Sequence, residues 1–163
     1  MYKIMSILLG LMCVSSTRAF AFELTSPAFK HNEMIPTKFT CQGNDINPEL
    51  NISNTPAGTK SLALIIDDPD APMGTWVHWV VFNIPPVQKI KENSIPGIQG
   101  YNDFKRVNFG GPCPPSGTHR YFFKLYALDS MLKLSEGATK TDVEGAMKSH
   151  ILAQTELMGL YKK

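Results

Sequence analysis

The sequence predicts a mainly β fold, a β-sandwich with flanking helices. Three apolar segments, 61–67, 75–84 and 121–128, have the length and composition of buried strands. Twelve glycines and twelve prolines indicate many turns rather than long helices. The one clear helical pattern comes near the end of the chain. Strands followed by a helix favour a β-rich domain.

The second strand is the most informative of the three. In the segment 75–84 (TWVHWVVFNI), residues alternate with a period of two. This alternation places Trp76, His78, Val80 and Phe82 on one face and Val77, Trp79 and Val81 on the other. Both faces are largely apolar, so we expect this strand to be covered on both sides.

The end of the chain reads as a helix. Thr141 and Glu144 have the spacing of a capping box. Helical spacing continues through four apolar residues, Val143, Met147, Ile151 and Met158. We therefore expect one amphipathic helix of about 16 residues. His150 falls near its apolar face, where a core histidine bonded to backbone is expected.

A long segment, 85–120, separates the second strand from the third. It is rich in Gly, Pro and Asn. A connection of this length is usually functional or contains short strands of its own.

The first 21 residues resemble a secretory signal peptide. Lys3 forms a short basic region, residues 4–14 are apolar, and Ala19-Phe20-Ala21 offers a cleavage site. The alternatives are a buried N-terminal strand and an uncleaved anchor. Cleavage predicts a single domain over 22–163 and a periplasmic or secreted location.

Charge argues against nucleic-acid binding. The chain has 16 basic and 14 acidic residues. Cleavage would remove Lys3 and Arg18 and no acid, which leaves a neutral chain without a basic run. Such a chain is a poor candidate for non-specific binding of nucleic acid.

Cleavage would also remove Cys13 and leave Cys41 and Cys113. An even pair in an oxidising compartment predicts a disulfide. Closing a loop of about 70 residues would contribute about 4 kcal/mol in the chain-entropy model. The alternative is two free thiols, and two cysteines alone make a weak metal site.

Two segments carry candidate chemistry. One is the Pro/Gly loop 115–121, in which His119 and Arg120 provide donors for an anion. The other joins the acidic loop 67–70 to His78. Each combines an apolar strand with a polar loop, so we interpret them as two walls of one pocket.

Three kinds of site fit these residues. A hydrolase could use Ser116, His119 and Asp68, although the G-x-S-x-G motif is missing. A metal could be held by His78, His119 and an aspartate, although metal-binding spacing is missing. The third is a small anion pocket in which aspartates orient the imidazoles. Anion binding by protonated histidine would weaken between about pH 5.5 and 8.

Two motifs resemble the signatures of the phosphatidylethanolamine-binding protein family. The first is Asp68-Pro69-Asp70-Ala71-Pro72 followed by Trp76-x-His78-Trp79, and the second is the segment 111–121, GPCPPSGTHRY. The bacterial Raf-kinase-inhibitor-like branch is the most similar. The resemblance covers nearly all of the chain after the signal peptide.

This resemblance implies an antiparallel β-sandwich with a few flanking helices. It also implies a pocket at one end for phosphate-type head groups and other small anions. The matching pocket positions are Asp68, His78, Pro114, His119 and Tyr121. Supporting positions in the same motifs are Asp70, Trp79, Gly117 and Arg120.

We therefore expect an exported, non-enzymatic binding protein that needs no cofactor or metal. The family inhibits kinases and serine proteases, and its bacterial members often form homodimers, so a protein target and a homodimer are further expectations. The alternative is a hydrolase or lyase that acts on a phosphorylated small molecule through His78, His119 and Asp68.

Some positions depart from the bacterial pattern. Ile52 replaces a tryptophan, Lys105 and Asn108 replace glycines, and Phe109 replaces a tyrosine. The last three lie near the pocket loop, where they could alter ligand preference.

Overall fold

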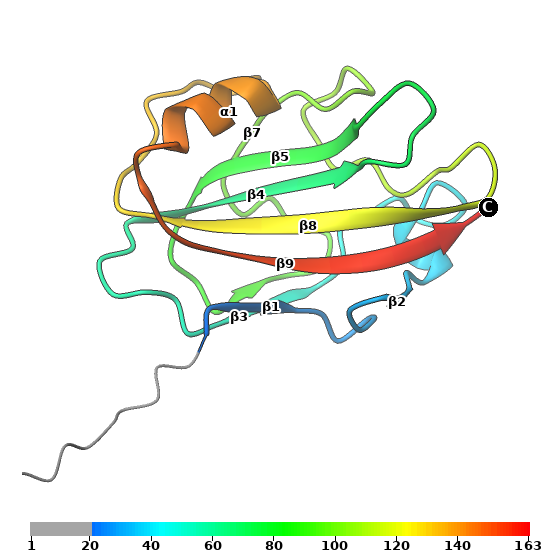
Figure 1. Ribbon diagram of the computed structural model, residues 1–163, viewed down its shortest axis with the longest axis horizontal. Helices are drawn as coiled ribbons and strands as arrows, with labels where there is room; N and C mark the ends of the chain where they lie inside the picture. The colour runs from blue at the N-terminus through cyan, green and yellow to red at the C-terminus, as the bar shows by residue number, and fades with distance from the viewer. Residues whose placement is uncertain (1–20) are drawn as a thin grey trace, which may run out of the picture.

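The computed structural model describes residues 21–163 as two β-sheets and one α-helix (Figure 1). The large sheet has six strands in the order β2-β9-β8-β4-β5-β7. Its strands are β2 (Glu33–Met34), β4 (Ser61–Asp68), β5 (Trp76–Ile84), β7 (Ile98–Gln99), β8 (Thr118–Leu128) and β9 (Ile151–Lys162). All pairings are antiparallel except the short β2–β9 contact.

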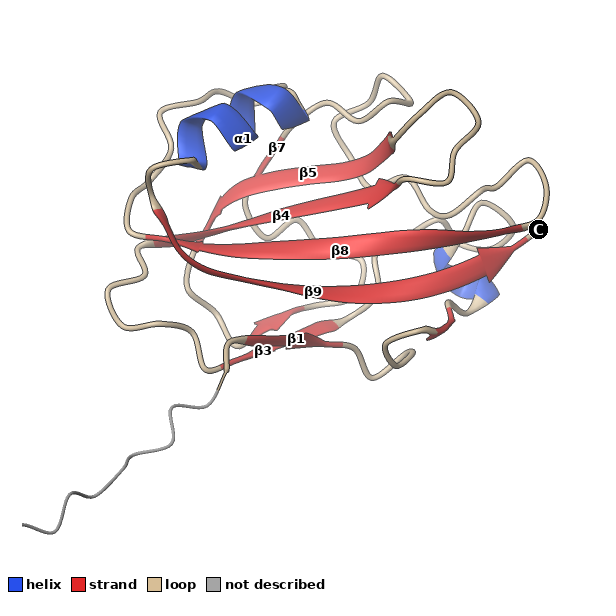
Figure 2. Cartoon of the chain, viewed as in Figure 1, coloured by secondary structure: helices blue, strands red, loops and turns tan. Residues whose placement is uncertain are grey.

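The small sheet has three strands in the order β1-β3-β6. These are β1 (Glu23–Thr25), β3 (Leu50–Ser53) and β6 (Lys89–Ile90). The strands β6 and β7 both lie in the segment 85–120, for which short strands were one of two expectations. Figure 2 shows the small sheet on one side of the large sheet and α1 (Lys140–Met147) on the other.

The large sheet is buried on both faces. One core cluster lies between the two sheets and includes Leu50, Leu64, Trp79 and Tyr121. A second, smaller cluster packs Val143 and Met147 of α1 against the sheet. The structure is therefore an antiparallel β-sandwich with one flanking helix and a short 3-10 helix, η1 (Thr37–Phe39).

The alternation predicted for β5 is wrong at its start. Ile66 of β4 pairs with Trp79 and Asp67 pairs with Val77, so His78 is an extra residue in a β-bulge. Val77 consequently joins Val80 in the cluster beneath α1. His78 instead packs against Tyr121, on the same side as Trp79.

The prediction of a long C-terminal helix is also wrong. The helix α1 ends at Met147, and residues Ile151–Lys162 form β9, which pairs with β8 along its length. Buried residues at every second position, Leu157, Gly159 and Tyr161, show the strand period. Pairing with β8 therefore overrides the helical spacing that Ile151 and Met158 suggested.

The helix begins earlier than predicted. Its capping box joins Thr139 to Asp142, not Thr141 to Glu144. The Thr139 N–H donates to Asp142 Oδ2 at 2.8 Å, and Asp142 N–H donates to Thr139 Oγ1 at 3.2 Å. This reciprocal pair satisfies two donors at the start of the helix.

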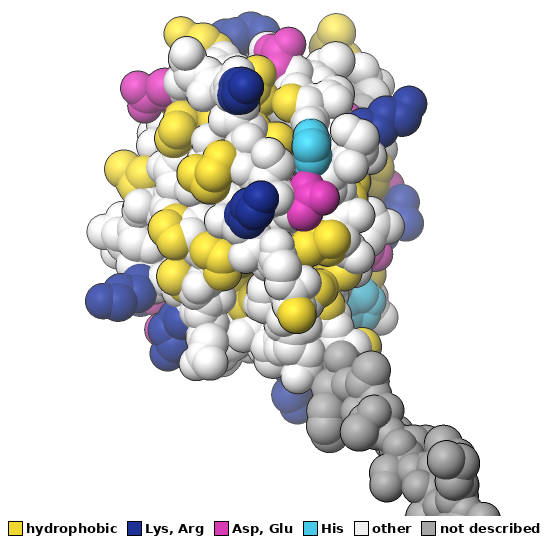
Figure 3. Space-filling model, turned by 90° about the vertical axis from the view of Figure 1, so that its left-hand side faces the viewer, with side chains coloured by type: hydrophobic (Ala, Val, Ile, Leu, Met, Phe, Trp, Pro, Cys, Tyr) yellow, Lys and Arg dark blue, Asp and Glu magenta, His cyan; other side chains and the backbone are white. Residues whose placement is uncertain are grey.

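His150 is not a core residue. Its side chain is 41% exposed, and its Nδ1 lies 2.8 Å from Asp129 Oδ1. It belongs to the end of the molecule opposite the C-terminus. Figure 3 shows that end, where charged side chains of both signs are mixed with hydrophobic ones.

The expected signal peptide falls almost entirely outside the described residues. Within 21–163, no helix has the length and apolar character needed to cross a membrane.

Candidate ligand-binding site

Four of the five predicted pocket residues meet at one end of the large sheet. Asp68 ends β4, and antiparallel pairing brings that end to the start of β8, where His119 and Tyr121 lie. His78 lies near the start of β5, the other neighbour of β4. Residues from three strands therefore form one cluster, which we call the His78–His119 cluster (Asp68, His78, His119 and Tyr121).

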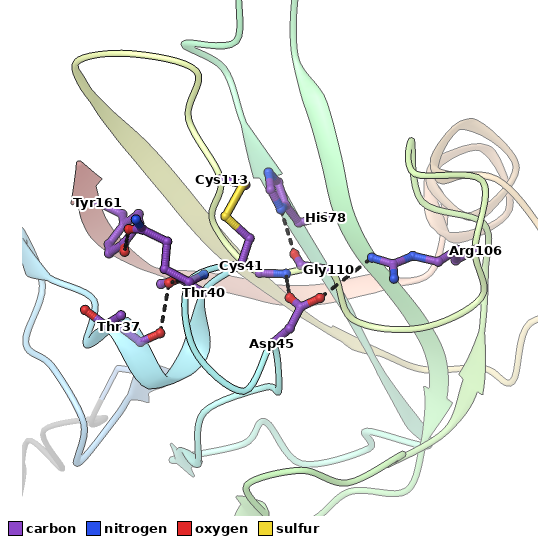
Figure 4. Close-up of a disulfide and its surroundings, with 11 residues drawn as sticks. Thr37, Thr40, Cys41, Asp45, His78, Arg106, Gly110, Cys113 and Tyr161 are labelled. Carbon is purple, nitrogen blue, oxygen red and sulfur yellow. Dashed lines mark hydrogen bonds and ion pairs between the residues drawn. A yellow bond between two sulfur atoms is a disulfide. The ribbon is translucent and has the colours of Figure 1, made fainter. Parts of the chain in front are cut away.

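The bulge in β5 directs His78 towards a loop. Its Nδ1 lies 2.7 Å from the carbonyl oxygen of Gly110, and the Gly110 N–H donates to the His78 carbonyl at 3.0 Å (Figure 4). A carbonyl can only accept, so Nδ1 carries the proton. The Nε2 atom makes no hydrogen bond within residues 21–163.

Burial sets the protonation of His78. The side chain is almost completely buried, and this lowers the pKa of the imidazole below its usual value, while the Gly110 carbonyl and Asp68 partly oppose that shift. At neutral pH the ring is therefore uncharged. Its Nε2 then presents a lone pair, and it becomes a donor only in acid.

His119 is oriented by Asp68. Its Nδ1 lies 2.7 Å from Asp68 Oδ2, and the side chains are 9% and 4% exposed. The carboxylate accepts, so the proton of a neutral His119 ring sits on Nδ1. Its Nε2 likewise has no hydrogen-bond partner in the described part of the chain.

Tyr121 lies beside His78. Its ring packs edge-on against the imidazole with centroids 5.2 Å apart. The hydroxyl is buried and makes no well-formed hydrogen bond with residues 21–163, although Asp68 and the backbone of Cys113 lie nearby. Burial raises the pKa of this phenol, and Asp68 raises it further, so the hydroxyl keeps its proton.

The second wall is a loop fixed by the predicted disulfide. Cys41 and Cys113 are bonded, with Cα atoms 5.5 Å apart. The Cys41 N–H also donates to the Pro112 carbonyl at 3.2 Å. Pro114 is buried just after the disulfide, and Gly117 turns the chain with φ +73° before β8 begins.

Asp70 and Arg120 brace the loops outside the cluster. Arg120 donates to the Asp70 carboxylate from Nε at 2.9 Å and from a terminal nitrogen at 2.7 Å. These hydrogen bonds hold the pKa of Asp70 at about 2. Trp79, the remaining supporting residue, is buried and donates its indole N–H to Gln99.

The sequence predicted no pocket role for several residues that surround His78. Phe104 packs edge-on against the imidazole, with centroids 5.4 Å apart, and also against Trp76. The buried Trp76 Nε1 lacks a partner among the described residues. Asn102 donates to the Asn108 carbonyl at 2.8 Å and so fixes the loop that contains Phe104. A strict period of two in β5 does not predict that His78 faces this loop, because the bulge changes the side to which the ring points.

The geometry gives little support to the two other kinds of site. No hydrogen bond joins the exposed Ser116 to His119 in the described part of the chain. Residues 21–163 contain no group of three His, Cys, Asp or Glu side chains placed to hold a metal. A hollow of about 800 Å³ lies between α1 and loop 101–105. None of the four residues of the His78–His119 cluster lines it.

The phosphatidylethanolamine-binding protein family model matches residues 25–162. The chain belongs to this family. A UPF0098 protein of Methanothermobacter thermautotrophicus is 49% identical over 148 residues, which cover 86% of this chain and 98% of the relative. A UPF0098 protein of Aquifex aeolicus is 48% identical over 151 residues, covering 86% and 88%.

Solved structures agree with this assignment. A putative phosphatidylethanolamine-binding protein homologue from Chlamydia trachomatis superposes with a TM-score of 0.85 at 45% identity, covering 88% of this chain and 98% of the other. YbcL from E. coli, described as a new member of the mammalian family, gives 0.81 at 32% identity, covering 87% and 98%.

Proposed function

We propose that this member of the family is an exported, non-enzymatic binding protein. In this proposal, the His78–His119 cluster binds a small phosphate-type anion or a phospholipid head group. Modulation of a protein partner, in the manner of a kinase or protease inhibitor, is a further part of the proposal and rests on the family resemblance alone.

The buried Tyr121 hydroxyl, which makes no well-formed hydrogen bond within residues 21–163, is the observation that carries the proposal. Buried polar groups are nearly always hydrogen-bonded, and leaving one unpaired costs about 1–3 kcal/mol. An anion that accepts from this hydroxyl would remove that cost. When their rings are protonated, His78 and His119 each add an Nε2–H donor from the same cluster.

The protonation of His78 sets the pH at which an anion binds best. A neutral His78 offers a lone pair, which repels an anion, whereas the protonated ring donates a charge-assisted hydrogen bond. Because burial lowers the pKa of His78, this gain comes only on the acidic side of the usual histidine range. Binding should therefore strengthen below about pH 6.5, a lower window than the sequence suggested.

Titration calorimetry with a phosphodiester of ethanolamine tests the proposal, since the charge of a phosphodiester is constant between pH 5 and 8. Tyr121→Phe removes only the hydroxyl and should weaken binding by about 5- to 30-fold. Tyr126→Phe is the matched control, because this half-buried tyrosine of β8 lies outside the cluster. Equal affinity of the unsubstituted protein and Tyr121→Phe, at both pH 5 and pH 8, would contradict the proposal.

Export is tested separately. The exported protein should begin at Phe22, and N-terminal sequencing of protein recovered from outside the cytoplasm checks this. Recovery of Met1 would contradict both cleavage and the compartment.

The alternative function is a hydrolase or lyase acting on a phosphorylated small molecule. The buried His119–Asp68 pair favours it, because a carboxylate-oriented imidazole can act as a general base. A panel of phosphoesters decides between the two. Turnover that disappears in His119→Ala would replace the binding function with catalysis.

A further inference from the structure

A second hollow, of about 410 Å³, opens beside the sheet. It lies between three loops and the edge strand β7, and it has a volume typical of small-molecule sites. Its lining residues are Asp45, Ile46, Asn47, Trp79, Asn93, Ser94, Ile95, Gln99, Asn108 and Phe109. None of the four residues of the cluster lines it.

Gln99 presents an amide donor to this hollow. The side chain is only 7% exposed, and its Oε1 accepts from Trp79 Nε1 at 2.8 Å. An indole N–H can only donate, so the oxygen of the amide must face Trp79. The Nε2 group, with two N–H donors, is thereby left without a hydrogen bond among residues 21–163.

The Gln99 amide is held in place at the wall of the hollow. Gln99 is held from both sides, since its backbone pairs with Val81 and its carbonyl accepts from Gly137 N–H at 2.9 Å. The side chain therefore cannot turn to solvent without breaking its bond to Trp79. A ligand oxygen in the hollow would take the place of water at the two free donors.

The other polar groups around the hollow are neutral or acidic. Asn93 and Asn108 present exposed amides at the rim. Asp45 supplies a carboxylate: Oδ1 accepts from Gly111 N–H, and Oδ2 lies 3.8 Å from a terminal nitrogen of Arg106. Among residues 21–163, no Lys or Arg lines the hollow itself. This set disfavours an anion and suits a molecule whose groups both donate and accept.

The remaining wall is apolar. Phe109 packs edge-on against Trp79 with centroids 5.7 Å apart, and both lie beside Gln99 at the base of the hollow. Ile95 is 71% exposed at the rim. Aromatic and aliphatic side chains next to amides suit a ligand that has a C–H face as well as hydroxyl groups.

We propose that this hollow is a second binding site, for a small uncharged polyhydroxylated molecule of monosaccharide size. Gln99 Nε2 donates to a ligand hydroxyl, and the Asp45 carboxylate accepts from another. The rim amides of Asn93 and Asn108 add exchangeable contacts, and Phe109 packs against the C–H face. The site is independent of the function proposed for the His78–His119 cluster.

Titration of the protein, residues 22–163, with glucose, galactose, mannose and N-acetylglucosamine tests this site. Calorimetry and Trp fluorescence are the readouts. At least one sugar should bind saturably. Gln99→Glu keeps an oxygen for Trp79 but removes the free N–H donors, and should weaken binding at least 10-fold. Asn108→Ala should weaken it severalfold, and since Asn108 is exposed, this variant decides the matter if Gln99→Glu fails to fold.

Two controls separate the sites. Asn51→Ala removes an amide from β3, outside the hollow, and should leave sugar binding unchanged. His119→Ala should also leave it unchanged, and phosphoethanolamine should not compete with the sugar. The absence of saturable binding by any of these sugars, binding unaffected by both Gln99→Glu and Asn108→Ala, or competition by phosphoethanolamine would overturn the proposal.

Discussion

His119 and Asp68 form a buried pair, with Nδ1 2.7 Å from Oδ2 and side chains only 9% and 4% exposed. A second pair, His150 and Asp129, has Nδ1 2.8 Å from Oδ1, but its side chains are 41% and 49% exposed. The chain thus contains two His–Asp pairs with similar contact distances and opposite burial. The difference in burial decides how much each pair contributes to stability.

We expect Asp68→Ala to lower the free energy of unfolding by about 1.5–3 kcal/mol, because it leaves a buried imidazole N–H without its acceptor. Asp129→Ala is the matched control. It should cost less than about 1 kcal/mol, since water replaces an exposed partner. Urea unfolding measures both values. Equal losses in the two variants would show that Asp68 is not buried as described.

His78 should make the protein less stable in mild acid. Its folded pKa lies below the unfolded value of about 6.5, so the unfolded chain binds more protons between these two values. Its contribution to stability is therefore fully present above about pH 6.5. It falls as pH decreases from there towards the folded pKa.

The variant His78→Gln tests this expectation. Glutamine keeps an N–H donor for the Gly110 carbonyl but does not titrate, so the loss of stability between pH 7.5 and 5 should become smaller. The exposed His31 provides the control, and His31→Gln should keep the full loss. Guanidinium unfolding at pH 7.5 and pH 5 measures the stability of the unsubstituted protein and of both variants. An identical pH dependence in all three would refute the role of His78. The low pKa of Asp70 acts only below about pH 4 and does not interfere.

The sequence predicted three long strands of the large sheet well, because each is a compact apolar run. The predicted segments 61–67, 75–84 and 121–128 correspond to β4, β5 and β8. It failed after Met147, where Ile151 and Met158 fit a helical spacing by chance. Only the pairing of β9 with β8, a non-local interaction, distinguishes the strand from the helix.

The candidate site shows a similar division. Its residue types follow from motifs, because Asp68, His78 and His119 stand beside loops rich in Pro and Gly. Their partners do not follow, since the Gly110 carbonyl is 32 residues from His78 and Asp68 is 51 residues from His119. The bulge at His78 turns its side chain to the side of the sheet that faces the loop, and a strict alternation cannot predict it.

The disulfide should stabilise both the fold and the loop beside His78. It closes a sequence separation of 72 residues, so replacing both Cys41 and Cys113 with Ser should lower the free energy of unfolding by about 4 kcal/mol. Thermal unfolding with and without dithiothreitol measures this. The reductant should destabilise the protein and leave the double variant unaffected. Two alkylated thiols in protein recovered from an oxidising compartment would contradict the bond.

Two glycines test where the helix ends and the last strand begins. Gly159 lies in β9, where an added Cβ would come within 2.5 Å of Ile35 Cγ1 and 2.7 Å of Phe29 Cε2. Gly159→Ala should therefore cost about 1–3 kcal/mol through overpacking. Gly145 lies in α1 with nothing within 4 Å of the added atom. Gly145→Ala should stabilise the protein by about 0.5–1 kcal/mol, because alanine favours the helix.

The opposite signs of these two effects distinguish the observed strand from the helix that the sequence suggested. A helix continuing through Met158 would place Gly159 at its C-terminal end, where glycine is common and alanine costs little core packing. Chemical denaturation of the two single variants and of the double variant provides the measurement. The two effects should be additive, since the glycines share no contacts. A neutral Gly159→Ala would mean that β9 does not pack against Phe29 and Ile35.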